Sequence, residues 1–426
     1  MAITDLPADA HTNPLYNEYW VRPAADIDAH LDELRSQPMQ FFAEPELPPD
    51  APLPQGPGYW AVTNHADIVH MSKNPKVFSS GSGIVAQDMP HDIMEFFSSM
   101  IAMDDPRHVR LRRIVAAGFT PKMMQRLEDS VQLVASSIVD EICEQGEVDF
   151  VVDVAARLPL KIVCDLMGIP ESQYQFVFDR TNIILGQSDP EYAGAAGDDL
   201  LLALINAATD LVGLMNDVAA TKSGGEGTDL TSVLMNATVP EDELTPEDIA
   251  SFFILLVVAG NETTRNAISW GLKLLTDNPG ERAKWAADFD ALAPGAVEEI
   301  VRLASPVTYM RRTATEDTEL SGQKVSEGDK LCMFYLAANR DPSVFEDPYR
   351  FDISRSPNPQ LGYGGPGPHF CLGAHLARRE ITVMFRELFN RLPDIHATGE
   401  PDLLMSSFIH GVKHLGASFT PTSKSV

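Results

Sequence analysis

The chain has 426 residues, of which 44% are hydrophobic, and this is enough apolar material for a large core. Its 32 Lys and Arg residues against 61 Asp and Glu residues give a net charge of −29, which argues against nucleic acid or an anionic membrane as a partner. Four cysteines without paired spacing indicate a reducing compartment and no disulfide framework.

We expect one folded unit over residues 1–426, because no linker, repeat or low-complexity tract divides the chain. The N-terminal segment up to Trp20 contains no Lys or Arg and no apolar core of the kind found in secretory signals. The longest apolar run, Ile249 to Gly260, is too short to span a bilayer. The sequence therefore predicts a cytoplasmic protein without a membrane anchor.

The first unusual segment is basic, in a chain that is otherwise acidic. Residues 103–112 read Met-Asp-Asp-Pro-Arg-His-Val-Arg-Leu-Arg and predict the start of a helix. His108 and Arg112 are four residues apart and therefore share one face of that helix. Taken alone, each of them has a simpler explanation as a solvated surface base.

A long helix is predicted to begin at Thr245, which offers an N-cap hydroxyl before Pro246 at the first helical position and acids in the first turn. Pro279 ends it, after about 32 residues or roughly 48 Å. Residues Phe252 to Ala259 are apolar on every side, so this stretch is expected to be buried.

A polar run, Asn261-Glu262-Thr263-Thr264, interrupts the helix directly after Ala259 and Gly260. Buried polar groups are costly unless they are used or solvated. Two explanations remain at this point. The helix emerges into water beyond Gly260, or the acid and the hydroxyls have a chemical task.

A second helix carries a candidate ion pair. Glu299 and Arg302 are three residues apart, and Glu298 and Arg302 are four apart, so either acid shares a face with the arginine. Spacing alone does not choose between the two acids. The simplest explanation is a surface ion pair worth well under about 1 kcal/mol.

Cys371 follows a stiff loop, Gly364 to Phe370, and a helix-forming run begins at Ala374. The free N–H groups of Leu372, Gly373 and Ala374 are expected to point at the sulfur and, with the helix dipole, to depress the pKa of the thiol. A thiolate held in this way can ligate iron. The other cysteines lie in apolar runs and are expected to be small buried side chains: Cys143, Cys164 and Cys332.

The cysteine loop, the run Ala259 to Thr264 and the Glu299/Arg302 pair together resemble the motifs of the cytochrome P-450 superfamily of haem-thiolate monooxygenases. The resemblance extends from about Tyr16 to about Phe419. One departure is that Gly364 replaces the family's Phe seven residues before the cysteine, with Tyr363 one residue earlier. The chain is most similar to an actinobacterial branch that oxidises methyl-branched lipids and sterols near the chain terminus.

The resemblance implies a mainly α fold with a smaller β-rich region. It is the cytochrome P-450 fold, a triangular prism in which the haem lies between the long helix and the cysteine loop. We expect the α-rich part at about residues 100–300 and 370–392, and the β-rich part at about 50–63, 305–335 and 400–420.

By resemblance, the cofactor is haem b and Cys371 is its axial thiolate ligand. Glu262 and Thr263 match the family's acid–alcohol pair beside the distal face of the haem. Glu262 would relay protons from bulk water, and the Thr263 hydroxyl would pass them on or donate back to the carbonyl four residues earlier.

The resemblance also gives roles to further charged residues. The predicted partners of the haem propionates are His108, Arg112, Arg312 and His369. A buried structural network behind the cysteine loop is predicted to consist of Glu299, Arg302 and Arg350.

We predict a monooxygenase that inserts one atom of O2 into a C–H bond of a lipophilic substrate, by terminal (omega) hydroxylation of a methyl-branched lipid, isoprenoid or sterol side chain. The pocket residues expected from the family are Ile84, Val85, Ile101, Leu255, Val258, Ala259, Val307 and Phe408. The alternatives are the same chemistry on a smaller terpenoid or aromatic, a peroxide-driven hydroxylase that would not need Thr263, and a non-catalytic haem protein that binds a ligand or senses gas.

The sequence contains no flavin or iron–sulfur segment, so the electrons are expected from a separate ferredoxin and ferredoxin reductase. An acidic ferredoxin is predicted to dock on the cysteine side of the haem, against Arg107, Arg110, Arg113, Arg378 and Arg379.

Overall fold

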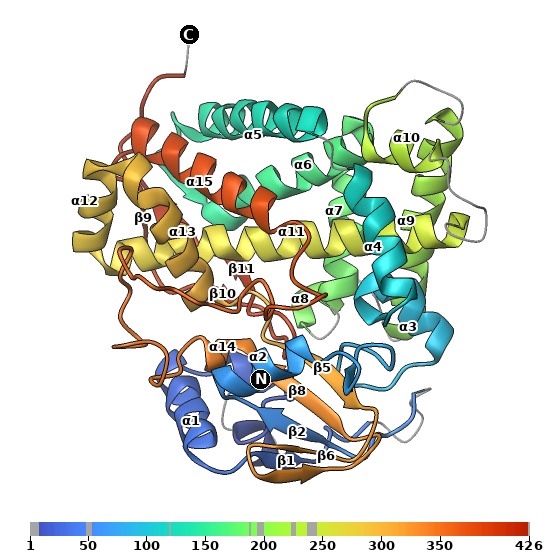
Figure 1. Ribbon diagram of the computed structural model, residues 1–426. Coiled ribbons are helices and arrows are strands. Elements are labelled where there is room, and N and C mark those ends of the chain that lie inside the picture. The colour runs from blue at the N-terminus through green and yellow to red at the C-terminus, as the bar shows by residue number, and fades with distance from the viewer. Residues whose placement is uncertain are drawn as a thin grey trace.

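The computed structural model describes residues 8–47, 53–118, 121–186, 189–193, 200–222, 227–236 and 245–424. Its helices are α1 (Ala24–Ser36), α2 (His65–Lys73), α3 (His91–Ser98), α4 (Arg107–Gly118), α5 (Pro121–Ile142), α6 (Arg157–Met167), α7 (Tyr174–Leu185), α8 (Pro190–Ala193), α9 (Leu200–Lys222), α10 (Leu230–Met235), α11 (Pro246–Asp277), α12 (Pro279–Ala287), α13 (Phe289–Ala304), α14 (Tyr335–Ala338) and α15 (Ala374–Arg391). Most of these helices form one part of the molecule, and a smaller part surrounds a sheet (Figure 1).

The long helix α11 has the boundaries that the sequence predicts. The Thr245 hydroxyl accepts the N–H of Asp248 at 3.1 Å, and the Asp248 carboxylate accepts the N–H of Thr245 at 3.1 Å, so the two residues form a capping box. The helix crosses the helical part and packs against α6, α9, α13 and α15 (Figure 1). Phe253, Ile254 and Val257 are completely buried, as the all-round apolar pattern predicts.

The strands are short: β1 (Gln40–Phe42), β2 (Tyr59–Val62), β3 (Phe78–Ser79), β4 (Glu147–Asp149), β5 (Tyr309–Ala314), β6 (Thr318–Leu320), β7 (Gln323–Val325), β8 (Lys330–Phe334), β9 (His396–Ala397), β10 (Asp402–Leu403), β11 (Val412–His414) and β12 (Gly416–Ser418). The main sheet has the order β1-β2-β8-β5-β3, and β5 and β8 pair antiparallel with Arg311 opposite Cys332. The three predicted β-rich regions all contain strands, whereas β1, β3, β4 and β9 lie outside them.

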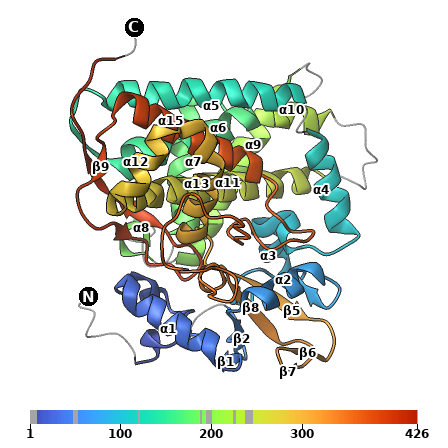
Figure 2. The same ribbon diagram turned by 60° about the vertical axis from the view of Figure 1, so that its left-hand side comes forward.

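Helix α15 begins shortly after Cys371 and packs against α5, α11 and α13. It crosses close to α11 in both views (Figures 1 and 2). The cysteine loop therefore enters the helical part beside the long helix.

Among the described residues, one helical stretch has the length and composition of a membrane span: Leu202–Lys222 of α9, with a mean hydropathy of 1.2 and 33% of it buried. Core helices of soluble proteins meet the same criterion, and α9 packs against α7, α10 and α11.

Candidate active site

The cysteine loop is held by its own backbone. The N–H of Cys371 donates to the carbonyl of Tyr363 at 3.0 Å, and the N–H of Phe370 donates to the carbonyl of Gly367 at 3.2 Å. Gly364 adopts a φ of +82°, which favours glycine at the position where the family usually has Phe. The guanidinium of Arg378 lies 4.3 Å from the centre of the Tyr363 ring, so this aromatic side chain is fixed by the helix that follows the loop.

Cys371 is an exposed residue, whereas the other three cysteines are buried as predicted. Burial nevertheless raises the pKa of the Cys371 thiol, against the lowering effect of the N–H groups of Gly373 and Ala374 and of Arg112 and Arg378. The N–H groups of the helix start thus lower the pKa as predicted, but the predicted net lowering is wrong, because desolvation is the stronger effect. A desolvated thiol suits a group whose metal ion would keep the thiolate ionised.

The four bases predicted to hold the haem propionates converge in the structure. The rings of His108 and His369 lie 4.2 Å apart, and burial, Arg312, His108 and Arg112 together lower the pKa of His369. Nε2 of the buried His108 and Nδ1 of His369 have no hydrogen-bond partner in the described part of the chain. Two arginines thus lie beside two ring nitrogens that have no hydrogen-bond partner. This arrangement fits anionic groups with several oxygen acceptors, such as the two propionates of a haem.

The polar break in α11 creates an accessible stripe in a buried helix. Ala259 is exposed and Thr263, one turn further along, is half-buried. The Thr263 hydroxyl donates to the Ala259 carbonyl at 2.8 Å, which is the local bond that we considered for it. Asn261 and Glu262 are buried, so the explanation in which the helix emerges into water beyond Gly260 is wrong.

Glu262 pairs with a residue that sequence reasoning missed. Its carboxylate accepts a hydrogen bond from the guanidinium of Arg265, and Arg265 Nη1 also donates to Asn182 Oδ1 of α7 at 3.3 Å. The Glu262 side chain is 1% exposed, so the predicted relay of protons from bulk water would have to reach it through other groups or ordered water. Burial raises the pKa of Glu262, and Arg265 opposes that shift.

The buried Glu262/Arg265 pair is unsaturated, in the sense that some of its polar atoms have no hydrogen-bond partner. Within the described residues, Glu262 Oε1, Arg265 Nε and both amide atoms of Asn261 have no hydrogen-bond partner. Buried orphaned groups of this kind usually bond to ordered water. The spacing Glu262/Arg265 equals that of Glu299/Arg302, and this was the signal in the sequence that could have identified Arg265.

The structure brings together half of the predicted pocket residues. Ile84, Val85, Ile101 and Phe408 belong to one apolar cluster, which also contains Met89, Met94, Ala102 and Met310. Leu255, Val258 and Ala259 lie along α11, and Leu255, Val258 and Ile101 all pack in the main hydrophobic core. Val307 packs in a different cluster, on the sheet, and forms a β-bridge with Ile409.

The structural network differs from the prediction in one member. Glu299 and Arg302 pair at 2.8 Å with both side chains completely buried, which excludes a surface ion pair. The third cation is Arg355, whose Nε lies 3.1 Å from Glu299 Oε1. Arg350 was wrongly assigned, since its side chain is 61% exposed and only its carbonyl accepts a bond from Arg302, at 3.2 Å.

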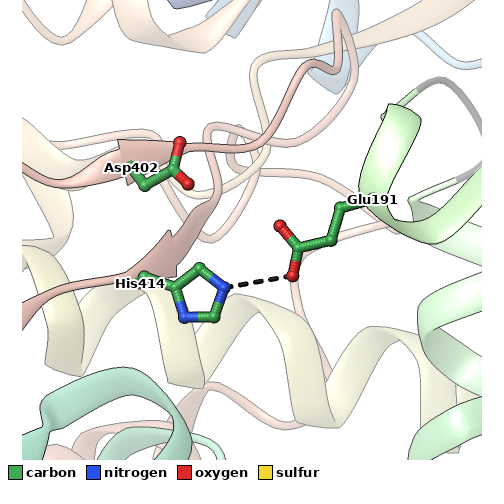
Figure 3. Close-up of side chains that lie close together, drawn as sticks. All are labelled: Glu191, Asp402 and His414. Carbon is green, nitrogen blue, oxygen red and sulfur yellow. Dashed lines mark hydrogen bonds and ion pairs between the residues drawn. The ribbon is translucent and has the colours of Figure 1, made fainter.

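A separate cluster of acids and a histidine lies between α8 and the β10–β11 hairpin (Figure 3). The ligand atoms of Glu191, Asp402 and His414 all lie within 4.8 Å of one another, a donor set that suits a metal ion. However, the Lys413 ammonium lies 3.1 Å from Glu191 Oε2 and 3.6 Å from Asp402 Oδ2. Both acids are thus paired with Lys413, and Glu191 also lies 3.0 Å from His414 Nε2, so we assign the cluster to an ion network that ties α8 to the hairpin.

Comparison with known proteins agrees with this geometry. The sequence profile of the cytochrome P450 family matches residues 211–401. The chain is 47% identical over 409 residues to the methyl-branched lipid omega-hydroxylase of Mycobacterium tuberculosis, covering 95% of this chain and 93% of that protein. It is 38% identical over 414 residues to the steroid C26-monooxygenase of Rhodococcus jostii, covering 93% of this chain and 84% of that protein.

Solved structures agree as well. A Mycobacterium marinum cytochrome P450 in complex with pseudoionone superposes with a TM-score of 0.89 at 41% identity, over 97% of this chain and 100% of that one. A Bacillus megaterium cytochrome P450 in complex with testosterone gives a TM-score of 0.77 at 28% identity, over 93% of this chain and 99% of that one. This chain therefore belongs to the cytochrome P450 family of monooxygenases, whose cofactor is a haem ligated by cysteine.

Proposed function

We propose that this protein hydroxylates the terminal carbon of a methyl-branched lipid. The observation that carries the proposal is the 47% identity to a methyl-branched lipid omega-hydroxylase, because it extends over 95% of the chain. The steroid C26-monooxygenases, at 36–38% identity, also have names that place oxidation on a branched hydrocarbon side chain. The apolar cluster around Ile84 and Phe408 supports a hydrophobic guest.

When bound, the haem supplies the oxidising chemistry: with O2, two electrons and two protons it inserts one oxygen atom into a C–H bond and releases the other as water. Cys371 would hold the iron from the side of the cysteine loop. His108, Arg112, Arg312 and His369 would bind the two propionates and so fix the rotation of the ring.

Glu262 and Thr263 would supply protons at the accessible stripe of α11. Thr263, half-buried one turn after Ala259, would hold or pass on a proton with its hydroxyl at this stripe. Glu262 would feed it through ordered water, since the carboxylate is buried and paired with Arg265. The orphaned atoms of Asn261 and Glu262 supply polar partners for that water.

Terminal attack requires control of position. A primary C–H bond is stronger than an internal one, so the pocket must hold the end of the chain over the iron and exclude the carbons behind it. The side chains proposed for this task are Ile84, Val85, Ile101, Leu255, Val258 and Phe408.

A second candidate substrate class has its own support. The Mycobacterium marinum P450 structure contains pseudoionone, an acyclic terpenoid ketone, and that protein is 41% identical to this chain. A smaller terpenoid oxidised by the same chemistry is therefore the alternative to a methyl-branched lipid.

We propose a ferredoxin and its reductase, in the cytoplasm, as the electron donors. Two of the arginines expected at the docking face have acidic partners: Arg107 lies 3.0 Å from Asp248 and Arg378 lies 2.5 Å from Glu298. An ion pair leaves the charge of each arginine in place, so the proposed face still comprises Arg107, Arg110, Arg113, Arg378 and Arg379. Arg113→Glu should slow reduction at low salt, and rising salt should slow the wild type, because charge steering is screened beyond about 8–10 Å.

The substrate proposal is tested with the reconstituted holoenzyme and a matched set of substrates: a methyl-branched fatty acid, its straight-chain counterpart, an acyclic terpenoid and a small aromatic. We expect the branched acid to give mainly the terminal alcohol. Preference for the terpenoid would favour the alternative, and scattered mid-chain products from the branched acid would refute terminal control.

The cofactor ligand is tested independently of substrate. Cys371→Ser should lose the red-shifted Soret band of the reduced CO complex, because this band requires a thiolate ligand. A variant that keeps this band would overturn the assignment of Cys371.

A further inference from the structure

Two buried cations lie beneath the loop that carries two of the proposed pocket residues. Arg311 is in β5 and Lys330 is in the neighbouring strand β8. Their side chains are 4% and 3% exposed. Burying two cations in one place costs free energy. The groups that these cations bind therefore indicate their function.

Both cations bind Asp88. Arg311 Nη1 donates to Asp88 Oδ1 at 2.7 Å, and Lys330 Nζ lies 2.7 Å from Asp88 Oδ2. Burial raises the pKa of Asp88, but the hydrogen bonds from Lys330 and Arg311 outweigh it and the pKa is lowered. The loop is therefore pinned by an ionised carboxylate with a cation on each oxygen.

The backbone of the same loop is also bonded to the sheet. The N–H of Arg311 donates to the Ile84 carbonyl at 2.7 Å, and Lys330 Nζ donates to the Ala86 carbonyl at 2.9 Å. In the other direction, the N–H of Ala86 donates to the Tyr309 hydroxyl at 3.2 Å. Arg311 Nη1 also donates to the Val85 carbonyl at 3.4 Å, so four of the five residues 84–88 are bonded to the sheet although they form no strand.

These bonds hold in place the part of the loop that forms one side of the apolar cluster. Ile84 and Val85 pack there against Ile101, Met310 and Phe408. Met310 and Arg311 are consecutive residues of β5, so their side chains point to opposite faces. One strand therefore supplies part of that side of the cluster and the anchor of the loop that completes it.

We propose that Arg311 and Lys330 are positioning residues that hold the loop 84–88, through Asp88, in the shape that determines which carbon of the substrate is oxidised. This inference rests on the proposed function in one respect, the assignment of Ile84 and Val85 to the substrate pocket. It goes further by naming residues that control regiochemistry without touching the substrate.

If these ion pairs only stabilised the fold, removing the charge of either acid bound to Lys330 would have the same effect. Glu44 therefore provides the control. Glu44 Oε1 lies 2.5 Å from the same Lys330 ammonium but belongs to the segment after β1, outside the loop. Asp88→Asn and Glu44→Gln each remove one negative charge from the surroundings of Lys330 with little change in the shape of the side chain. Only Asp88→Asn weakens the attachment of the loop.

The experiment measures two quantities in each holoenzyme. Amide hydrogen exchange of peptides covering residues 82–90 reports the loop, and the ratio of terminal to internal alcohols reports regiochemistry. We expect Asp88→Asn to speed exchange about tenfold, since a charge-assisted bond is lost, and to lower the product ratio severalfold while total turnover falls less. Glu44→Gln should leave both quantities near the wild-type values. Arg311→Lys, which keeps the charge but loses the planar fork, should lie between them.

Equal effects of Asp88→Asn and Glu44→Gln, or faster loop exchange with an unchanged product ratio, would overturn the inference. The product ratio is taken on whichever substrate the wild-type enzyme oxidises. Failure to oxidise a methyl-branched lipid would therefore count against the proposed function alone, while the comparison of the two variants still decides the role of the loop anchors.

Discussion

Two buried Glu-x-x-Arg pairs, one in α13 and one in α11, have the same spacing and very different surroundings. In α13, Arg302 donates to both carboxylate oxygens of Glu299 at 2.8 Å and to the carbonyls of Asn339 and Pro348 at 2.7 Å. Glu299 accepts further bonds from the N–H of Asp352 and from Arg355 and Asn358. Neither Glu299 nor Arg302 has a buried polar atom without a partner in the part of the chain described.

In α11, Glu262 and Arg265 share one hydrogen bond, and each keeps a buried atom without a partner among the described residues. An unsatisfied buried group costs about 1–3 kcal/mol, so such groups persist mainly where they have a use. The comparison indicates that the hydrogen bonds of the Glu299/Arg302 pair are fully used in holding the fold, whereas the Glu262/Arg265 pair keeps hydrogen-bonding capacity that the described residues do not fill.

A third buried acid extends the comparison, because it has no cation three residues later. Glu380 in α15 is 2% exposed, and its Oε2 makes no hydrogen bond to the described residues. Burial alone raises the pKa of Glu380 to about 8. Glu262, whose pKa is also raised by burial, differs in that Arg265 opposes the shift.

The saturated pair should give the largest loss of stability. Arg302→Ala leaves the carboxylate of Glu299 and three backbone carbonyls short of a donor, so we expect the free energy of unfolding to fall by about 3–5 kcal/mol, with little haem-loaded protein. Denaturant titration of purified protein and the haem-to-protein absorbance ratio measure this. Abundant, fully loaded Arg302→Ala protein would mean that the network is dispensable.

Glu380 should make stability depend on pH. Its pKa is 4.5 in the unfolded chain and about 8 in the fold, so the folded state binds more protons between these values and stability falls as pH rises through this window. The free energy of unfolding should fall by roughly 3–4 kcal/mol across it, because a tenfold change in a proton-binding constant corresponds to about 1.4 kcal/mol. Glu380→Gln should flatten this part of the stability curve, measured by urea titration at about pH 5 and about pH 8. Parallel curves for the variant and wild type would contradict the burial argument.

The unsaturated pair should affect turnover more than stability. Glu262→Gln keeps an acceptor for Arg265 but cannot carry a proton, so NADH-coupled product formation should fall about a hundredfold or more and peroxide should be released instead. The free energy of unfolding should fall by less than in Arg302→Ala, because the Gln side chain still offers Arg265 a hydrogen-bond acceptor although the counter-charge is lost. Wild-type coupling in Glu262→Gln, or a loss of stability as large as that of Arg302→Ala, would remove the distinction between the two pairs.

The smallest expected effect is the difference in stability between substitutions of two arginines near the Glu299/Arg302 pair. Arg355→Ala removes a charged donor to Glu299 and should lower the free energy of unfolding by about 1.5–3 kcal/mol. Arg350→Ala should change it by no more than about 0.5 kcal/mol, since that side chain is solvated and only its carbonyl takes part. Similar losses from both variants would restore Arg350 to the network.

The sequence by itself determined the features that depend on neighbours along the chain. The capping residues and Pro279 set both ends of α11, because helix boundaries are decided by local hydrogen bonding. The loop before Cys371 and the helix after it could be identified for the same reason. The fold and the cofactor were then predicted from the similarity of these motifs to one family.

Only the tertiary structure decided which charges meet. Arg350 and Arg355 both follow α13 at a long distance in sequence, and nothing local distinguishes the one that reaches Glu299. The burial of Glu262, its link to Asn182 and the raised pKa of Cys371 likewise depend on segments that are far apart along the chain. Desolvation and pairing are set by what surrounds a group in three dimensions, and the spacing of residues in a sequence does not contain that information.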